Sequence, residues 1–275
     1  MPELPEVETI VCDLRHLVQG RQIEKIRVSL PKIVRTGPRR LGTLLSGAVI
    51  TGARRRGKFI VLTFSENRYL VIHLKMTGHF LFCSSGLSEP IPKHVHVIFT
   101  FDNQTVLLYE DQRQFGYFLG LDQAGYEAWL ESDAIGPDPL EISTEKFTLR
   151  LSGKKSRIKA VLLDQKIVSG LGNIYVDESL FAAGLHPGRP ADSINRDDFQ
   201  KLHKEMVRIL SESITCRGST TNNYVGLMGV GGEFQNRHQV YGKAGQPCPK
   251  CGQTITRIVL AGRGTHFCSH CQPEA

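Results

Sequence analysis

The sequence predicts an α+β protein of more than one domain, on three observations. Apolar residues recur at helical spacing near the start, alternate with a period of two from Gln22 to about Leu121, and return to helical spacing beyond Gly136. Two Cys-x-x-Cys pairs lie near the end of the chain. We therefore expect an N-terminal helix, an antiparallel β-sandwich or barrel-like sheet, a helical region and a small metal-binding finger.

Length and composition narrow the class of protein. The 275 residues suffice for two domains, and a hydrophobic content of 40% predicts well-buried cores. No apolar run approaches the roughly 18 residues of a membrane span, and the acidic N-terminus does not resemble a signal peptide. We expect a cytoplasmic protein with no membrane partner. The net charge of +7, much of it in basic runs at residues 54–58 and 154–159, favours a polyanionic partner.

A first helix is predicted from about Pro5 to Gly20. Apolar residues between Val7 and Val18 recur at i, i+3 and i+4 spacing. Proline suits the first helical turn, and glycine suits the position just after the last. Packing along one face of this helix would hold the N-terminus in place.

The opening stretch MPELPEVETI also suggests chemistry. Removal of Met1 would leave Pro2 as a free secondary amine, and an α-amino group has a pKa near 7.7–8.0, so part of it is uncharged at neutral pH. Such an amine beside a carboxylic acid, here Glu3, is a nucleophile with a proton donor. The alternative interpretation is that these residues only start the helix.

The remaining elements follow from the period of the apolar residues. Strands are predicted at residues 23–28, 58–64, 69–74, 94–101 and 105–109, the last two as a hairpin. Helices are predicted around residues 158–162, at 173–183 and at 199–214, with a stop at Gly218. The segment Gly136–Pro139 is the best linker candidate. We expect domains at residues 1–135, 136–235 and 236–275.

The cysteine pairs predict a structural zinc site. Cys248 and Cys251 form one Cys-x-x-Cys turn, and Cys268 and Cys271 form the other, with sixteen residues between the two turns. Two such turns complete a tetrahedral shell of four thiolates with no open position, so the zinc is structural and not catalytic. A redox role lacks the βαβ context that it would need.

Two single residues have positions that suit phosphate binding, one in a hairpin turn and one at a helix start. A strand at 254–260 and a tight turn at 261–264 place Arg263 at the tip of a hairpin, where a guanidinium can bind phosphate. Asn173 follows a Gly-rich turn at a helix start, where backbone N–H groups bind anions. A solvated loop arginine and a simple helix cap are the alternatives.

Several segments in one order resemble a known family. They are MPELPEVET, Arg56-Gly-Lys58, His73-Leu-Lys-Met76, Asp111-Gln-Arg-Gln-Phe-Gly116, Gly170-Leu-Gly-Asn-Ile-Tyr-Val-Asp-Glu178 and the four-cysteine finger. Together they resemble bacterial formamidopyrimidine-DNA glycosylase, an 8-oxoguanine DNA glycosylase/AP lyase. The related endonuclease VIII branch opens with Pro-Glu-Gly-Pro-Glu, so Leu4 favours the purine-lesion branch.

The resemblance implies a base-excision repair enzyme. Such an enzyme removes 8-oxoguanine and formamidopyrimidines from duplex DNA and nicks the abasic site by β,δ-elimination. Also implied are a helix-two-turn-helix DNA-binding domain, one structural zinc ion and a monomer in the bacterial cytoplasm, associated with the nucleoid. The expected partner is double-stranded DNA containing oxidised purines or abasic sites.

The same resemblance assigns roles to residues. Pro2 would attack C1′ and form a Schiff base, and Glu3 would protonate the sugar. Lys58 would act as an acid and phosphate ligand, and Arg263 as a phosphate clamp during δ-elimination. Glu6 would support the pocket.

DNA contacts are implied at a further set of positions. They are His73, Met76, His94, Arg113, Phe115, Lys154 and Asn173. Of these, Met76, Arg113 and Phe115 match a wedge that fills the gap left by the flipped base, although Met76 and Phe115 could instead be core residues. Ser219 is expected in a loop that grips the lesion base.

The chain departs from the family pattern at a few positions. Gln112 and Gln114 replace the usual residues of the wedge segment, and Asn222 stands in the lesion loop where relatives carry Arg or Lys. Asn222 bears on base preference and not on catalysis. Two alternatives stay open: an endonuclease VIII-like enzyme for oxidised pyrimidines, and a non-catalytic zinc protein that binds damaged DNA. The second would not need Pro2, Glu3 and Lys58 together.

Overall fold

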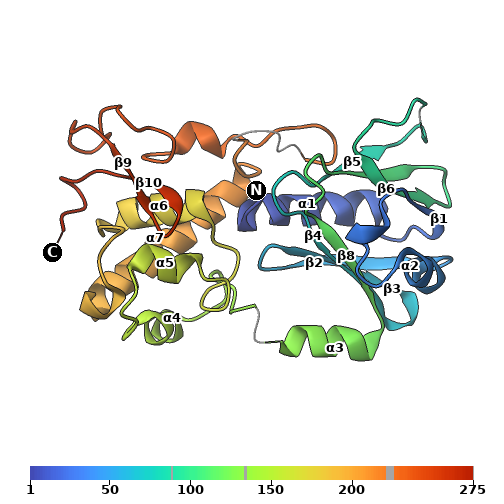
Figure 1. Ribbon diagram of the computed structural model, residues 1–275, viewed down its shortest axis with the longest axis horizontal. Coiled ribbons are helices and arrows are strands. Elements are labelled where there is room, and N and C mark those ends of the chain that lie inside the picture. Colours follow the sequence, from blue (N-terminus) through green and yellow to red (C-terminus); the bar gives the residue numbers. More distant parts are fainter. Residues whose placement is uncertain (88, 133–134, 221–225, 275) are drawn as a thin grey trace. The chain divides into compact units, whose positions relative to one another are not determined.

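The chain folds into two compact units. The computed structural model describes residues 1–87, 89–132, 135–220 and 226–274 (Figure 1). One unit consists of Met1–Ser132 together with Cys216–Glu233, and the other of Asp133–Thr215 together with Phe234–Ala275. The segment that contains Ser219 therefore belongs to the same unit as the N-terminus. The predicted boundaries at 135 and 235 stay a prediction.

The first unit is an antiparallel β-sandwich with helices packed against it. Among the described residues, its strands form two sheets in the orders β1-β6-β7-β5 and β2-β3-β4-β8. Its elements are α1 Leu4–Val18, β1 Ile23–Val28, η1 Pro31–Ile33, α2 Pro38–Leu45, β2 Ile50–Arg56, β3 Phe59–Phe64, η2 Ser65–Asn67, β4 Arg68–His73, β5 His79–Cys83, β6 Val95–Phe101, β7 Val106–Glu110, β8 Tyr117–Leu121 and α3 Gln123–Glu131. This confirms the predicted fold class.

Helix α1 forms where the sequence predicts it. Its apolar face, from Leu4 to Val18, is buried in the core that both sheets share. At its start the backbone N–H of Glu3 donates to Glu6 Oε2 at 2.8 Å, half of a capping box. Gly20 follows with a φ of 84°, which glycine adopts without steric cost. The N-terminus is thus fixed by packing, and Pro2 itself is buried.

One strand begins later than predicted, and the difference concerns a candidate site residue. The strand expected from Lys58 begins at Phe59, because Arg56 pairs directly with Phe59 across a two-residue turn. Gly57 has a φ of 57° there, a left-handed conformation that only glycine adopts freely. Lys58 is therefore a buried turn residue between β2 and β3.

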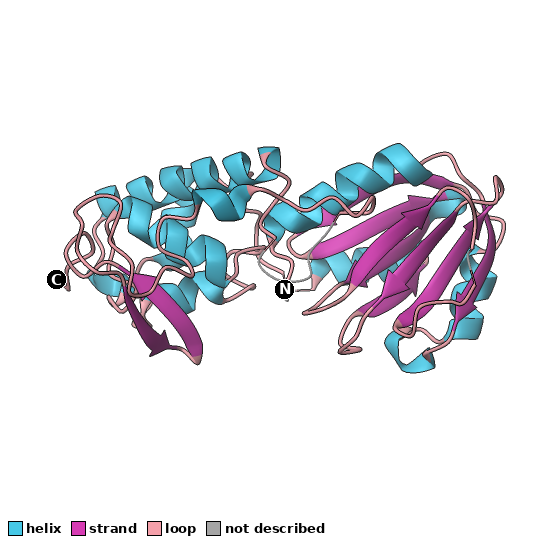
Figure 2. Cartoon of the chain, turned by 90° about the horizontal axis from the view of Figure 1, so that it is seen from above, coloured by secondary structure: helices cyan, strands magenta, loops and turns pink. Residues whose placement is uncertain are grey.

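The second unit is helical and ends in a β-hairpin. Its elements are α4 Thr144–Leu151, α5 Ile158–Leu163, α6 Asn173–Ala183, η3 Ala191–Ser193, α7 Arg196–Thr215, η4 Phe234–Arg237, β9 Thr256–Leu260 and β10 Arg263–Phe267. Figure 2 shows the helices of this unit beside the single hairpin. Helix α6 spans the predicted residues, from the end of the Gly-rich turn to Gly184, whose φ of 76° makes it a left-handed cap.

Helix α6 is buried along most of its length, and it anchors the chain that leads to the finger. The Glu178 carboxylate accepts three consecutive backbone N–H groups, from Gln239 at 2.8 Å, Val240 at 3.0 Å and Tyr241 at 2.8 Å. Burial raises the pKa of Glu178, and these three hydrogen bonds oppose the increase. The segment before the zinc ligands is therefore fixed to α6.

Helix α7 ends earlier than predicted. It stops at Thr215 and not at Gly218. Gly218 instead has a φ of 81° and lies against Glu6, where an added Cβ would come within 2.7 Å of Glu6 Oε1. The glycine is thus needed for close approach of the backbone to a carboxylate. No helix in the described part of the chain is both long and apolar enough to cross a membrane.

Candidate active site and zinc finger

The carboxylate of Glu6 links the N-terminal segment to the expected lesion loop. Its side chain is only 2% exposed. Oε2 accepts the backbone N–H of Glu3 at 2.8 Å, and Oε1 accepts the backbone N–H of Ser219 at 2.8 Å. Both oxygens therefore have donors, which satisfies the buried charge. The structure thus brings the backbones of Glu3 and Ser219 together at Glu6. Both residues are buried, and so is Pro2.

The surroundings of the Met1 amine, here called the N-terminal site together with Glu3, Glu6 and Lys58, favour the neutral form of the amine. Burial lowers the pKa of the Met1 ammonium from its ordinary value of 8.0. The carboxylates of Glu3 and Glu6 raise this pKa, whereas the Lys58 ammonium lowers it further. An amine here releases its proton more readily than an exposed one. Lys58 is therefore close enough to the N-terminus to act on its charge.

His73 lies at the end of β4 as a neutral ring. Burial, with the nearby cations Lys75, Lys58 and Arg35, lowers its pKa to about 3. Its Nδ1 accepts the backbone N–H of Lys75 at 3.0 Å, so the ring proton is on Nε2. The ring stacks on Tyr117 with centroids 5.7 Å apart. His73 is thus a fixed, uncharged hydrogen-bond donor.

Two cations beside His73 were not predicted from the sequence. The Arg35 guanidinium lies 3.3 Å above the centroid of the Tyr117 ring, and Lys75 Nζ lies 5.7 Å from it. Within the described residues, neither side chain forms an ion pair. Arg35 stands alone in the sequence, so no basic run marked it. By contrast, Arg55 of the basic run donates to Glu8 at 2.8 Å and has a structural role.

The expected wedge residues are exposed on two loops of the first unit. Met76, between β4 and β5, is 41% exposed, and Phe115, between β7 and β8, is 53% exposed. The Arg113 guanidinium lies 4.8 Å from the centroid of the Phe115 ring. Met76 and Phe115 therefore do not belong to the core. His94 is half-buried just before β6, and its carbonyl accepts the N–H of Asp111 at 3.0 Å.

In the second unit, Arg263 stands beside the tip of the finger hairpin. Leu260 pairs with Arg263 across Ala261 and Gly262, whose positive φ values of 49° and 69° are those of a tight two-residue turn. The side chain of Arg263 is exposed. The next carbonyl, of Gly264, accepts Asn173 Nδ2 at 2.8 Å. The start of α6 and the hairpin tip are therefore tied together.

A buried ion pair supports the same hairpin. Lys159 Nζ lies 2.6 Å from Asp177 Oδ1, and both side chains are 0% exposed. Lys159 also donates to the Gly264 carbonyl at 3.2 Å, and Asp177 Oδ2 accepts the His266 N–H at 2.9 Å. Lys159, counted in a basic run, is thus structural. Lys154 from the same run is exposed, and its side chain makes no hydrogen bond or ion pair with the described residues.

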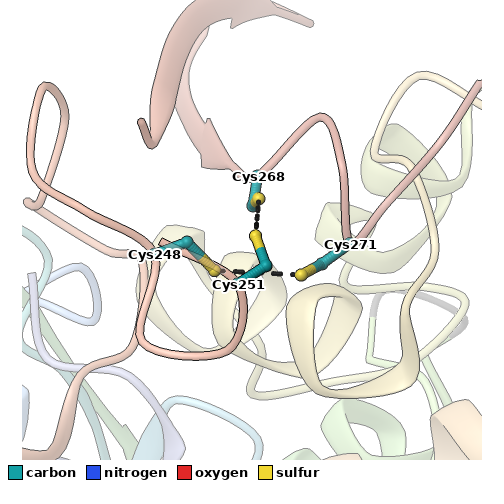
Figure 3. A group of neighbouring side chains, drawn as sticks. All are labelled: Cys248, Cys251, Cys268 and Cys271. Carbon is teal, nitrogen blue, oxygen red and sulfur yellow. Dashed lines mark hydrogen bonds between the residues drawn. The ribbon is translucent and has the colours of Figure 1, made fainter. Parts of the chain in front are cut away.

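The four finger cysteines converge on one centre, as Figure 3 shows. All four Sγ atoms lie within 4.8 Å of one another, with Cys248 and Cys271 at 3.8 Å and Cys251 and Cys268 at 3.5 Å. Tetrahedral zinc with Zn–S bonds of about 2.3 Å places its sulfur ligands about 3.8 Å apart. The donor set therefore fits one structural zinc ion, which confirms the cofactor prediction.

Comparisons with known proteins cover the whole chain. Residues 1–118 match the model of the formamidopyrimidine-DNA glycosylase N-terminal domain, 135–225 that of its H2TH domain, and 245–273 that of the zinc finger found in FPG and IleRS. Formamidopyrimidine-DNA glycosylase of Exiguobacterium sp. is 44% identical over 99% of both chains. Formamidopyrimidine-DNA glycosylase of Geobacillus kaustophilus is 41% identical over 99% of this chain and 100% of the relative.

Solved structures agree with this assignment. A Lactococcus lactis FPG mutant bound to DNA containing Fapy-dG matches with a TM-score of 0.94 and 36% identity, over 99% of this chain and 100% of that one. MutM bound to DNA containing carbocyclic 8-oxo-G matches over the same shares, with a TM-score of 0.91 and 36% identity. The chain therefore belongs to the formamidopyrimidine-DNA glycosylase family, as a DNA glycosylase with a structural zinc finger.

Proposed function

We propose that this protein removes oxidised purines from duplex DNA and then cleaves the resulting abasic site, using the amine of Pro2. The observation that carries the proposal is the environment of the N-terminus. There, burial lowers the pKa of the Met1 amine, and Glu3, Glu6 and Lys58 are close enough to act on its charge. Removal of Met1 would expose the amine of Pro2 to the same neighbouring charges. The relatives support the substrate class, because solved complexes of Lactococcus lactis FPG contain DNA with Fapy-dG or an abasic site.

The chemistry begins once Met1 has been removed and the lesion base has left the duplex, at a cost of a few kcal/mol. The neutral Pro2 nitrogen attacks C1′ of the damaged nucleotide, and the bond from C1′ to the base breaks. The N–H proton of Pro2 passes to the departing base, and Glu3 donates a proton to the sugar ring oxygen O4′ as the C1′–O4′ bond breaks, which leaves an iminium ion on C1′. The iminium acidifies the C2′ protons, so the phosphates leave by β- and then δ-elimination.

Groups on both units suit the binding of the DNA backbone. His73 offers an Nε2–H donor, and the cations Arg35 and Lys75, which form no ion pair with the described residues, lie beside it. In the second unit, Asn173 and Arg263 would bind phosphates, with the zinc finger holding Arg263 in place. Lys58 would serve both as an acid and as a phosphate ligand.

Borohydride trapping tests the proposal. The protein is reacted with duplexes that contain 8-oxoguanine, formamidopyrimidine or thymine glycol, and the reduced complex is digested and analysed by mass spectrometry. We expect efficient trapping with the two purine lesions and a cross-link in the first peptide, at Pro2. A cross-link at Lys58, or none with 8-oxoguanine, contradicts the proposal.

The thymine glycol duplex separates the main alternative. One Lactococcus lactis FPG structure contains DNA with an oxidised pyrimidine, so some reaction with this lesion would not be surprising. Preferential trapping on thymine glycol would favour an enzyme for oxidised pyrimidines. Asn222, which bears on base preference, lies outside the described residues.

A further inference from the structure

The two loops that carry the expected wedge meet at one buried carboxylate, that of Asp111, which is 0% exposed. Its Oδ1 accepts the hydroxyl of Thr77, beside Met76, and the backbone N–H of Arg113 at 3.2 Å. Thr77 Oγ1 in turn accepts the same Arg113 N–H at 3.0 Å. The Met76 loop and the Arg113 loop are therefore joined through a single group.

The second oxygen of Asp111 joins the loops to the sheet. Oδ2 accepts the Tyr109 hydroxyl at 3.2 Å and the backbone N–H of Gly116 at 2.8 Å. Burial raises the pKa of Tyr109 above its usual range, and Asp111 adds to the increase, so the hydroxyl stays protonated and remains a donor. All four donors to Asp111 are thus neutral, and no described cation forms an ion pair with it.

Both loops also close directly on the Tyr109 hydroxyl. A Cβ added to Gly78 would come within 2.4 Å of Tyr109 Oη, and one added to Gly116 within 1.7 Å. Neither position has room for a side chain. The backbone of Asp111 is fixed as well, because its N–H donates to the His94 carbonyl at 3.0 Å and its carbonyl lies 3.0 Å from His96 Nε2.

We propose that Asp111 and Tyr109 form a post that couples the two loops, so that Met76, Arg113 and Phe115 enter DNA as one rigid element. The inference rests on the proposed wedge role of these three side chains. Asp111 is a positioning residue, because it contacts no DNA itself. A buried carboxylate held by several donors must keep them together, since each lost partner leaves a buried charge less satisfied. The exposed side chains of the wedge are then already ordered in the free protein, which lowers the entropic cost of inserting them into DNA.

A double-mutant cycle tests this coupling. Met76→Ala and Phe115→Ala are made singly and together, first in the natural chain and then with Thr77→Val, which keeps the shape of the side chain and removes the hydroxyl. Single-turnover excision of 8-oxoguanine is measured, together with cleavage of a preformed abasic site, which has no base to expel. In the natural chain we expect the double variant to lose less excision rate than the product of the two single fold-losses, by a factor of about three or more. With Thr77→Val the effects should become multiplicative.

Conservative variants separate positioning from folding. Thr77→Ser keeps the hydroxyl and should restore the natural coupling. Thr105→Val is the control: it removes a hydroxyl whose one partner among the described residues is Asn103, in the β6–β7 turn, and it should change nothing. Asp111→Asn should lower excision of the intact lesion more than cleavage of the abasic site. Should this variant unfold, the Thr77→Val cycle still decides, because its melting temperature can be checked beforehand.

The possible failures can be told apart. If Met76→Ala and Phe115→Ala leave excision unchanged, the wedge assignment is wrong and the coupling falls with it. If both substitutions impair excision but the coupling between them is the same with threonine and with valine at position 77, the wedge assignment is supported and the coupling through Asp111 is refuted. Neither result bears on Pro2, which the borohydride cross-link tests separately.

Discussion

The zinc finger and the N-terminal site are each organised around acidic side chains, but over very different distances along the chain. The finger ligands fall within Cys248–Cys271, and their spacing alone predicts tetrahedral zinc. The N-terminal site depends on Glu6, which accepts one backbone N–H from three residues away and another, of Ser219, from 213 residues away. A metal site built from local turns can thus be recognised in a sequence, whereas a carboxylate that bridges distant backbone groups cannot.

The largest effect should come from breaking the finger. Cys248→Ser or Cys268→Ser removes a thiolate, so the metal should be lost and the hairpin should unfold, since structural zinc contributes about 10–16 kcal/mol to small finger folds. DNA binding should fall sharply, while the sandwich keeps its own core. Zinc analysis and thermal unfolding measure this, with Cys83→Ser on β5 as the matched control. Folded, active protein without zinc would refute the prediction.

The N-terminal site should respond differently to two isosteric substitutions. Glu3→Gln cannot deliver a proton, so we expect excision to fall about 10²- to 10⁴-fold with DNA binding retained. In Glu6→Gln the side-chain NH2 group faces the backbone N–H of either Glu3 or Ser219. That N–H loses its acceptor, so we expect the free energy of unfolding to fall by about 1–3 kcal/mol. Single-turnover rates and urea unfolding distinguish the two. If Glu6→Gln lowers the excision rate as much as Glu3→Gln does and leaves the free energy of unfolding unchanged, Glu6 does not bridge Glu3 and Ser219.

The sequence predicted elements well wherever local chemistry decides them. Helix α6 was predicted at its observed residues, with a Gly-rich turn before Asn173, and in the structure a left-handed glycine follows Ala183. Helix α1 was predicted from its apolar stripe and from Pro5. These signals act within a few residues, so they survive without knowledge of the fold.

The errors came from contacts that only the folded chain provides. Gly218 was expected to end a helix, but it is required by the approach of Glu6. Lys159 was counted in a basic run that favours a polyanionic partner, yet it is buried against Asp177 on the next helix. Asp111 lay inside a recognised motif with no role assigned, because its partner Thr77 is 34 residues distant. In each case the partner is far away in sequence, and residue type alone does not reveal it.

A smaller effect should appear in the pH dependence of the sandwich. His73 has a folded pKa of about 3 against an ordinary value of 6.5, so the unfolded chain binds a proton that the folded chain does not. The free energy of unfolding should therefore fall as pH drops below 6.5, by about 2 kcal/mol between pH 7 and pH 5. Trp129, the single tryptophan, packs edge-to-face with Phe59 and reports the unfolding of this unit by its fluorescence.

The control for this measurement is a histidine on the surface of the same unit. His73→Gln should remove most of the pH dependence seen at Trp129, while His16→Gln, exposed on α1, should leave it unchanged. If His73→Gln unfolds with the pH dependence of the natural chain, the histidine is not held neutral, and its proposed role as an uncharged donor to phosphate is wrong.

The smallest effect concerns Arg35, the cation that the sequence did not mark. Its guanidinium lies on the Tyr117 ring beside His73 and has no ion pair among the described residues, so its charge is available to a phosphate. A protein that neutralises one phosphate of duplex DNA changes the slope of log K against log salt by about 0.9. Arg35→Gln should therefore make the slope shallower by roughly that amount, and Arg21→Gln, an exposed arginine after the far end of α1, should leave it unaltered. Binding of lesion duplex across a salt series measures both. An unchanged slope for Arg35→Gln would show that this side of the sandwich has His73 as a donor but no additional phosphate contact.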